Sequence, residues 1–260
     1  MRANDGYDSF GFALPEKAPT TELLDSPCWE FSDLIMLDPV QMVVPWRVGE
    51  PAPLSACRLL IDEGSPLVMA IDRRVGCNSV VISQLFSYLS ADEARRYFSY
   101  KRPSDAELFL LGRSLLRTLL ALLLGLKPTE VRIITGLHGK PSCPGGPEFN
   151  VSHSGDLVLI AIHPTCAVGV DVESSPVPAD WESISCRVLP ADVCLAVYAL
   201  PRQRQPLAFL QAWCHLEAQL KMVGTGFQAA PAAHWDSSLF RQWALALPQG
   251  YVGSVAMEKS

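Results

Sequence analysis

The stretch Val168-Gly169-Val170-Asp171-Val172-Glu173 reads as a β-strand with two chemically different faces. Successive side chains of a strand point to opposite faces, so the three valines face a core while Asp171 and Glu173 share the other face. Two carboxylates on one face repel each other unless a positive charge lies between them. The segment therefore predicts either a site for a hard cation such as Mg²⁺, which prefers oxygen ligands, or an exposed face with two solvated acids.

Segments on either side of this strand recur at a shared offset of 100 residues. Leu89-Ser90-Ala91-Asp92 resembles Leu189-Pro190-Ala191-Asp192, and Phe109-Leu110 returns as Phe209-Leu210. The matches are few, and leucine and alanine are common, so the duplication is a hypothesis. It predicts an α+β fold, a pseudo-twofold tandem of two similar α/β lobes, with a ligand cleft at the junction between them.

Helix and strand signals divide the chain into these two lobes. After a flexible tail over residues 1–30, which lacks hydrophobic periodicity, we expect an N-terminal lobe over 31–166 and a C-terminal lobe over 167–260. The capping pattern Ser-x-x-Glu predicts helix starts at Ser90 and at Ser104. The second of these helices is expected to end near Gly125 and Pro128. Further helices are expected from Pro190 and over Leu207–Val223, the latter ended by Gly224 and Gly226. Strands are expected within 34–48 and over 67–72, Leu157–Ile162 and Tyr251–Met257.

The helix predicted over Leu207–Val223 carries a third carboxylate, Glu217. Its apolar stripe must be buried and consists of Phe209, Trp213, Leu216 and Leu220. Glu217 flanks this stripe and lies one helical turn before Lys221. The two side chains could form an ordinary helix ion pair, worth about 0.3–0.5 kcal/mol. Alternatively, Glu217 is the third acid of a metal site and Lys221 binds phosphate.

Further segments offer groups that suit an anion. Phe149–Gly155 places His153 between Ser152 and Ser154, which can donate hydrogen bonds to phosphate oxygens, unless His153 is a loop residue satisfied by its neighbours. Gly139-Lys140-Pro141 predicts a turn with a fixed cation, or else a plain surface lysine. A basic cluster, either a solvated face or a phosphate site, comprises Arg95, Arg96, Lys101, Arg102, Arg113 and Arg117.

Composition limits the class of protein. Hydrophobic residues make up 49% of the 260, which is typical of a globular chain with a substantial core. A net charge of −6 argues against nucleic-acid binding by the whole surface. The eight cysteines show no metal-ligand spacing and are expected to be reduced, mostly buried thiols. The first residues lack the apolar core of a secretory signal, and no apolar run is long enough for a membrane span, so a cytoplasmic protein without membrane contact is expected.

The order and spacing of the polar motifs are more specific than any one of them. Gly139-Lys140-Pro141, Phe149–Ser154, Gly169–Glu173 and Trp213-x-x-x-Glu217-Ala218-x-x-Lys221 resemble the signature of the 4′-phosphopantetheinyl transferases. The match is to the monomeric, two-lobed class typified by the surfactin synthetase-activating enzyme. It runs from about Leu89 to Gly226, and it includes the segment from Arg113 to Arg117.

This resemblance implies a reaction and a set of roles. The 4′-phosphopantetheine arm of coenzyme A would move to a serine of an apo acyl or peptidyl carrier protein, releasing adenosine 3′,5′-bisphosphate. Catalysis would depend on Glu217, Asp171 and Lys221, with Glu217 as the base for the serine. The implied Mg²⁺ ligands are Asp171, Glu173 and Glu217, and the implied coenzyme A contacts are Arg96, Gly139, Lys140, Pro141, Ser152, His153 and Lys221.

Two positions depart from the family pattern. Leu216 stands where a lysine is usual, and Leu108 or a neighbour stands at a position that is usually basic. These departures leave open a non-catalytic relative that binds coenzyme A or docks on a carrier protein. An unrelated metal-dependent phosphohydrolase is a further alternative.

Overall fold

The computed structural model describes residues 39–40, 42–53, 65–136, 138–224 and 239–259. The tail predicted over residues 1–30, the start of the first lobe and Gly226 lie outside these ranges. Within the described residues, no helix is both long enough and apolar enough to cross a membrane.

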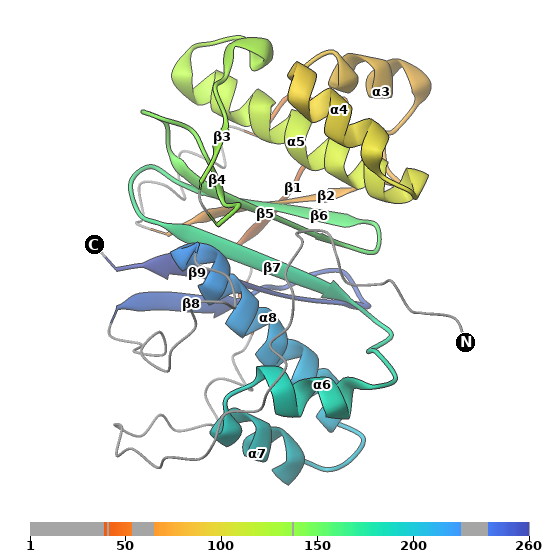
Figure 1. The fold of residues 1–260 in the computed structure, drawn as a ribbon, viewed down its shortest axis with the longest axis vertical. Coiled ribbons are helices and arrows are strands. Elements are labelled where there is room, and N and C mark those ends of the chain that lie inside the picture. Colours follow the sequence, from red (N-terminus) through yellow and green to blue (C-terminus); the bar gives the residue numbers. More distant parts are fainter. Residues whose placement is uncertain (1–38, 41, 54–64, 137, 225–238, 260) are drawn as a thin grey trace.

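The N-terminal half forms a four-stranded sheet covered by helices on one face (Figure 1). The sheet order is β1-β2-β6-β5, in which only β1 and β2 run parallel. Strands β3 and β4, of two residues each, form a separate two-stranded sheet that lies between the helices and β5 in the chain. The elements are β1 (Val43–Pro45), β2 (Leu67–Asp72), α3 (Ser79–Phe86), α4 (Ala91–Ser99), α5 (Pro103–Leu124), η1 (Pro128–Glu130), β3 (Ile134–Thr135), β4 (Pro141–Ser142), β5 (Glu148–Ser154) and β6 (Leu157–His163).

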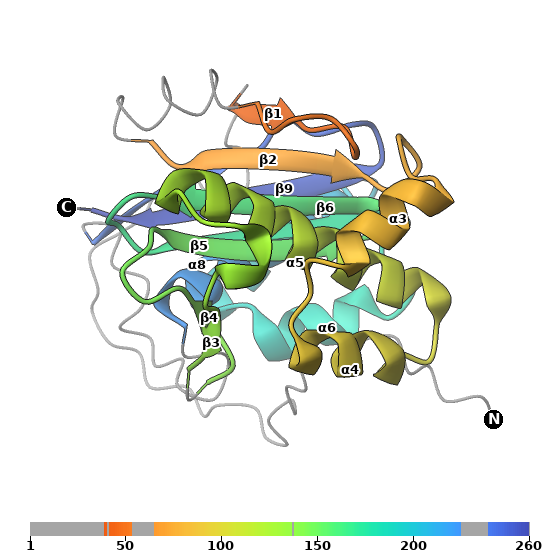
Figure 2. The same ribbon diagram turned by 90° about the horizontal axis from the view of Figure 1, so that it is seen from above.

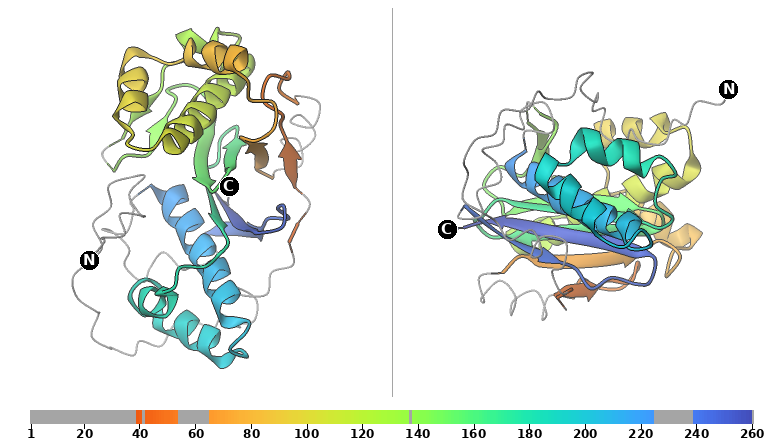
Figure 3. Two further views of the ribbon diagram at one scale, coloured as in Figure 1. Left: turned by 90° about the vertical axis from the view of Figure 1, so that its right-hand side faces the viewer. Right: turned by 90° about the horizontal axis from the view of Figure 1, so that it is seen from below.

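The C-terminal half repeats this plan. Its antiparallel sheet has the order β7-β9-β8, and its three helices again come between the first strand and the last two. Helices α6 and α7 pack against α8 at the end of the molecule farthest from α3 and α4 (Figure 3). The elements are β7 (Val168–Ser174), α6 (Trp181–Val188), α7 (Ala191–Ala199), α8 (Gln205–Val223), β8 (Phe240–Ala244) and β9 (Tyr251–Glu258).

The two halves match element by element, which is the repeat that the sequence predicted. Strands β2, β6 and β5 correspond to β7, β9 and β8 in both chain order and sheet order. Helices α4 and α7 begin 100 residues apart, at Ala91 and Ala191. The predicted two-lobed α+β architecture is confirmed, while the boundary at residue 166 stays a prediction.

Strand β6 lies at the centre of the core, between the helices of one half and the sheet of the other. All seven of its residues are buried. Val158, Ile160 and Ile162 pack with the leucines of α5. Leu159 and its neighbours on the opposite face pack with the three valines of β7. The two sheets therefore stack face to face, with helices outside both, as Figures 1 and 2 show.

Several predicted boundaries are confirmed. Ser90 caps α4, and the capping box with Glu93 is formed. Helices α5 and α8 end at glycines in the left-handed conformation, Gly125 and Gly224. The expected strands at Leu157–Ile162, Val168–Glu173 and Tyr251–Met257 are β6, β7 and β9.

Two predictions about local structure are wrong. The start of α5 is not at a Ser104 cap, because Pro103 occupies its first turn and Arg102 precedes it without a side-chain cap. Proline suits the first helical position because its fixed φ is already helical and its missing N–H is not needed there. The alternative that places His153 in a loop is wrong, because Phe149–Ser154 belongs to β5, which pairs with the whole length of β6.

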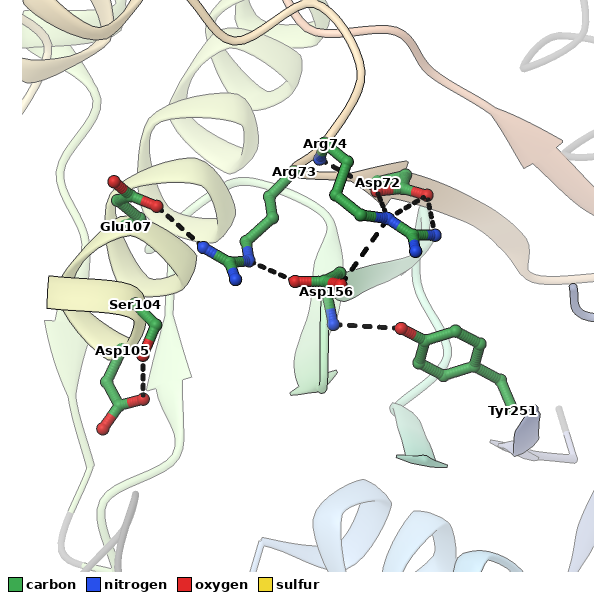
Figure 4. Close-up of polar contacts among 8 residues, drawn as sticks. All are labelled: Asp72, Arg73, Arg74, Ser104, Asp105, Glu107, Asp156 and Tyr251. Carbon is green, nitrogen blue, oxygen red and sulfur yellow. Dashed lines mark hydrogen bonds and ion pairs between the residues drawn. The ribbon is translucent and has the colours of Figure 1, made fainter. Parts of the chain in front are cut away.

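The turn between β5 and β6 is fixed from both sides (Figure 4). Asp156 in this turn accepts a hydrogen bond from Arg73 Nε at 2.5 Å, and Arg73 also reaches Glu107 Oε2 on α5 at 2.9 Å. On the other side, Tyr251 Oη, at the start of β9, accepts a hydrogen bond from the Asp156 amide at 3.0 Å. These contacts hold the end of β5, and with it His153 and Ser154, between the two halves.

Gly169 marks the point where α8 comes closest to β7. A Cβ atom at this position would lie 2.0 Å from Ala218 O and 2.2 Å from Met222 N, which are both backbone atoms of α8. Backbone atoms of a packed helix cannot rotate away as a side-chain tip can. The glycine therefore sets how closely α8 approaches the strand that carries Asp171.

Gly169→Ala is expected to lower the free energy of unfolding by about 3 kcal/mol or more, because the helix and the strand must separate. Denaturant unfolding followed by circular dichroism measures the change. The matched control is Gly145→Ala, since Gly145 has φ +74° but nothing within 4 Å of an added Cβ, and it reports strain alone, about 1–2 kcal/mol. Equal losses in the two variants would contradict the close-packing argument.

Candidate active site between the two halves

Strands β5 and β7 come together through side chains at the junction of the halves. Asn150 Oδ1 accepts a hydrogen bond from Val170 N at 3.0 Å, and Ser152 Oγ donates to Asp171 Oδ1 at 3.0 Å. Ser154 Oγ donates to Glu173 Oε2 at 3.1 Å. The three β5 residues share one face because they are spaced by two. The alternation of Asn, Ser and Ser in the sequence was the signal that could have identified β5 as a strand.

Asp171 is buried in an ion pair with Lys221. Its side chain is 4% exposed, and Lys221 Nζ lies 2.6 Å from Asp171 Oδ1. Lys221 Nζ also donates to Ser152 Oγ at 3.2 Å, which ties α8 to both strands. The interpretation of Asp171 and Glu173 as solvated acids is therefore wrong, because α8 and β5 cover this face of β7.

The second carboxylate oxygen of Asp171 has no hydrogen-bond partner. Oδ2 is the one buried side-chain nitrogen or oxygen atom in this state among the residues that the structure describes. A buried polar atom without a partner costs about 1–3 kcal/mol, and more if it is charged. Such an atom, beside two other carboxylates, is chemically suited to a hard cation, which offsets that cost.

The two glutamates of the site are hard to ionise. Burial, reinforced by the charge of Asp171, raises the pKa of Glu173 to about 7, although Glu173 accepts hydrogen bonds from Ser154 and Trp213. Burial also raises the pKa of Glu217 to about 7, with Lys221 opposing the shift. Asp171 and Glu217 raise the pKa of Lys221 against the effect of burial, so its ammonium group stays charged. The raised pKa of each glutamate indicates a buried carboxylate whose charge is not fully compensated.

These carboxylates do not already form a chelating group. Among the described residues, no three His, Cys, Asp or Glu side chains are gathered closely enough to hold a metal ion as they stand. A site made of Asp171, Glu173 and Glu217 thus requires the carboxylates to move toward one another. The donor chemistry and the free Asp171 Oδ2 fit a cation, and the ligand set itself stays a prediction.

A pocket opens beside this acidic centre and is lined by residues from both halves. Its basic lining residues come from α4, α5, β5, α8 and the turn before β4. Of the predicted coenzyme A contacts, Ser152 alone is not in its lining, because Ser152 is buried and donates its hydroxyl to Asp171. The residues that line the pocket include Arg96, Tyr100, Leu108, Phe109, Arg113, His138, Gly139, Lys140, Pro141, His153, Glu217 and Lys221.

The pocket's cations are held in place. Lys140 Nζ donates to Met222 O at 2.7 Å and to Val168 O at 3.2 Å, near the end of α8. Burial lowers the pKa of Lys140, and burial followed by the charge of Lys221 lowers the pKa of His153. Arg96 and Arg113 lie over the Phe109 ring, at 5.1 Å and 5.9 Å from its centroid. The partly desolvated lysine and arginine side chains around this space attract a multiply charged anion strongly.

The basic cluster of the sequence is divided: Arg95, Lys101 and Arg102 are exposed and outside the pocket lining, and the other three have separate roles. Arg96 and Arg113 face the pocket, whereas Arg117 is buried and binds Glu93 Oε2 at 2.7 Å and Val131 O at 2.8 Å. The solvated-face interpretation is wrong for Arg117, which holds α4, α5 and η1 together. Sequence reasoning missed Tyr100, Phe109 and His138 as pocket residues, and no spacing signal marks them.

The two departures from the family pattern differ in consequence. Leu216 is 3% exposed and packs among Trp181, Phe209 and other residues of the core beneath α8, so it belongs to that core. Leu108 is buried but also lines the pocket. An apolar wall therefore stands at Leu108, while the leucine at 216 is explained by packing.

The raised glutamate pKa values predict how stability depends on pH. A carboxyl group with a folded pKa of about 7 and an ordinary value of 4.5 favours the folded state at low pH, and that contribution is lost as pH rises from about 4.5 to about 7. In metal-free buffer, the melting temperature of the Glu173→Gln/Glu217→Gln variant minus that of the unchanged protein should therefore increase as pH rises from about 5.5 to about 8. The difference between the two isolates this contribution from that of other groups, and parallel curves would contradict it.

These features describe a duplicated α+β protein with a basic pocket and three desolvated carboxylates at the junction of its halves. Two family models match consecutive parts of the chain, "4′-phosphopantetheinyl transferase, N-terminal" over residues 78–165 and "4′-phosphopantetheinyl transferase superfamily" over 167–249. The chain belongs to the 4′-phosphopantetheinyl transferases, of the type represented by Sfp.

Curated relatives carry the same family name. The 4′-phosphopantetheinyl transferase HetI of Nostoc sp. strain PCC 7120 is 33% identical over 56% of this chain and 63% of its own length. Psf-1 of Bacillus pumilus is 31% identical over 56% of this chain and 62% of its own length, and Sfp of Bacillus subtilis strain 168 is 28% identical over 55% and 63%. The chain thus matches somewhat less than two thirds of the length of these relatives.

Proposed function

We propose that this protein transfers the 4′-phosphopantetheine group of coenzyme A to a serine hydroxyl of an apo acyl or peptidyl carrier protein. Adenosine 3′,5′-bisphosphate is the second product. The observation that carries the proposal is the pocket, in which Arg96, Lys140, His153 and Lys221 surround a space that has Glu217 on its wall. The family membership and the names of the relatives support the same reaction.

The pocket suits the charged end of coenzyme A. Arg96, Lys140, His153 and Lys221 bind its phosphates, and Gly139 and Pro141 border the adenosine end, while Ser152 supports Lys221 from below. Arg113 adds a cation at the Phe109 ring. Bound phosphate raises the pKa of His153 back toward its ordinary range, because a nearby negative charge favours the imidazolium form.

Phosphoryl transfer depends mainly on positioning and on neutralising the charge that develops. Lys221 and His153 hold the pyrophosphate so that the bond to the leaving bisphosphate lies opposite the incoming serine. Glu217 accepts the serine proton as the new oxygen–phosphorus bond forms. Mg²⁺, held by Asp171, Glu173 and Glu217, would supply charge neutralisation at the pyrophosphate when bound.

The proposal also covers the partners, the oligomeric state and the location of the protein. The substrates are coenzyme A and an apo carrier protein, and a net charge of −6 does not favour nucleic-acid binding by the whole surface. We propose that the protein acts as a monomer in the cytoplasm and without membrane contact.

Mass spectrometry of apo carrier proteins tests the proposal. Incubation with coenzyme A and Mg²⁺ should add one phosphopantetheine arm to the carrier, and EDTA should prevent the addition. The same incubation without carrier should release no inorganic phosphate. Coenzyme A binding without transfer would favour the non-catalytic relative, and phosphate release with an unmodified carrier would favour a phosphohydrolase.

A further inference from the structure

A pair of thiols lies outside the pocket, between α6 and α7. Cys186 Sγ is 3.7 Å from Cys194 Sγ, which is van der Waals contact. Among the six cysteines that the structure describes, all are free thiols. The connection between the two helices is only Leu189-Pro190, so the sulfur atoms are held opposite each other by a short, well-packed turn.

The two thiols differ in access to solvent. Cys186 is exposed on the last turn of α6, next to exposed Arg187. Cys194 is 8% exposed and lies in the core that α7 forms with α8. Burial raises the pKa of the Cys194 thiol, and its neighbour Cys186 adds to the shift. Cys194 therefore stays protonated, while Cys186 is the thiol that a dissolved oxidant reaches first.

We propose that Cys186 and Cys194 form a reversible intrachain disulfide when the protein meets a peroxide. The thiolate of Cys186 attacks the peroxide and breaks its O–O bond; with one proton from solvent, the products are a sulfenic acid on Cys186 and one molecule of water or alcohol. Cys194 then attacks the Cys186 sulfur, the S–S bond forms, and the sulfenic oxygen leaves as water with the Cys194 proton. One peroxide is reduced and two thiols are oxidised; a dithiol or another thiol pair reverses the step.

The geometry favours closure over further oxidation. A disulfide needs a sulfur–sulfur distance near 2.05 Å, so the two sulfur atoms must approach by roughly 1.6 Å. Because Cys194 is already in contact, it competes with a second peroxide for the sulfenic acid. The polar neighbours Tyr198 Oη, 3.7 Å from Cys186 Sγ, and Ser185 Oγ, 3.9 Å from Cys194 Sγ, can hydrogen-bond the sulfenic oxygen.

An aromatic row gives the pair an optical reporter. The Tyr198 ring stacks on Trp181 at a centroid distance of 6.0 Å, and Trp181 contacts Phe209 at 5.7 Å. Phe209 leads to Trp213, whose Nε1 donates to Glu173 Oε1 at 3.3 Å. A disulfide next to Tyr198 is expected to change the fluorescence of Trp181. The aromatic contacts also connect α6 to Glu173 in the acidic centre.

The test treats the reduced full-length protein with hydrogen peroxide and maps its peptides without reduction. The expected product is a cross-link between the Cys186 and Cys194 peptides, a mass loss of two hydrogens, altered tryptophan fluorescence and full reversal by dithiothreitol. Cys194→Ser should instead accumulate sulfenic and then sulfinic acid on Cys186. Cys77→Ser, a half-buried cysteine outside the pair, is the matched control and should leave the cross-link intact.

The proposal fails if peroxide leaves both thiols reduced, if Cys186 is oxidised to sulfinic acid in the unchanged protein, or if Cys186 pairs with a cysteine other than Cys194. Because the readout is the cross-link, it is independent of transferase activity.

Discussion

Glu217→Gln is expected to reduce phosphopantetheine transfer by about 10²–10⁴-fold, since the variant loses the base for the serine and a negative charge for the cation. The same change should leave stability at pH 7 intact or raised. Glu217 is buried with a pKa raised to about 7, so its ionised form is costly there, and glutamine has the shape of the neutral form without titrating. Loss of activity without loss of stability is the signature of a residue that serves chemistry.

Carrier modification followed by mass spectrometry and a melting curve measure the two effects. Glu182→Gln is the matched control, because it makes the same chemical change at an exposed helical position on α6 and should alter neither. Near-normal transfer by Glu217→Gln would remove Glu217 from the catalytic centre. A large drop in melting temperature would show that its charge stabilises the fold.

Asp171→Asn is expected to lower both activity and stability, in contrast to Glu217→Gln. It leaves the Lys221 ammonium in a largely buried site without its 2.6 Å partner. Breaking one side of such a pair costs about 3–5 kcal/mol. Lys221→Met alone leaves the Asp171 carboxylate in the same position and should cost a similar amount.

The double variant Asp171→Asn/Lys221→Met should be more stable than the sum of the single changes predicts, because no uncompensated charge remains. A double-mutant cycle by denaturant unfolding should give a coupling energy of about 1–3 kcal/mol. Transfer should be lost in all three variants. A coupling energy near zero would contradict a stabilising ion pair, and residual transfer in the double variant would contradict the roles given to both residues.

Strand β5 shows most clearly which part of the structure the sequence could predict and which part it could not. The sequence left a phosphate-binding segment and a loop as alternatives for the motif from Phe149 to Ser154, and the structure shows a strand. Its polar side chains looked solvent-facing because the partner that hydrogen-bonds them, β7, belongs to the other half of the chain. The same reason made Asp171 look solvated, although α8 and β5 bury it. Periodicity reports which residues share a face but not what covers that face.

Local signals succeeded where the cause is local. The Ser90 capping box and the glycines at 125 and 224 fix helix ends through contacts within a few residues. Near Ser104 there were two local signals for a helix start, the capping pattern at Ser104 and the proline at 103, and the helix begins at the proline. Leu216 looked like a lost polar contact until the packing of α6 and α7 on α8 gave it an apolar environment.

The duplicated α+β plan and the family could be inferred from the sequence, together with part of the pocket lining, because strand alternation, helix caps and motif order are properties of neighbours along the chain. The packing of the two halves was needed to show that Lys221 pairs with Asp171, that Asp171 Oδ2 has no partner, and that Arg113 enters the pocket while Arg117 does not. Distances, burial and pKa values depend on atoms from segments far apart in sequence, and those meet only when the two halves pack.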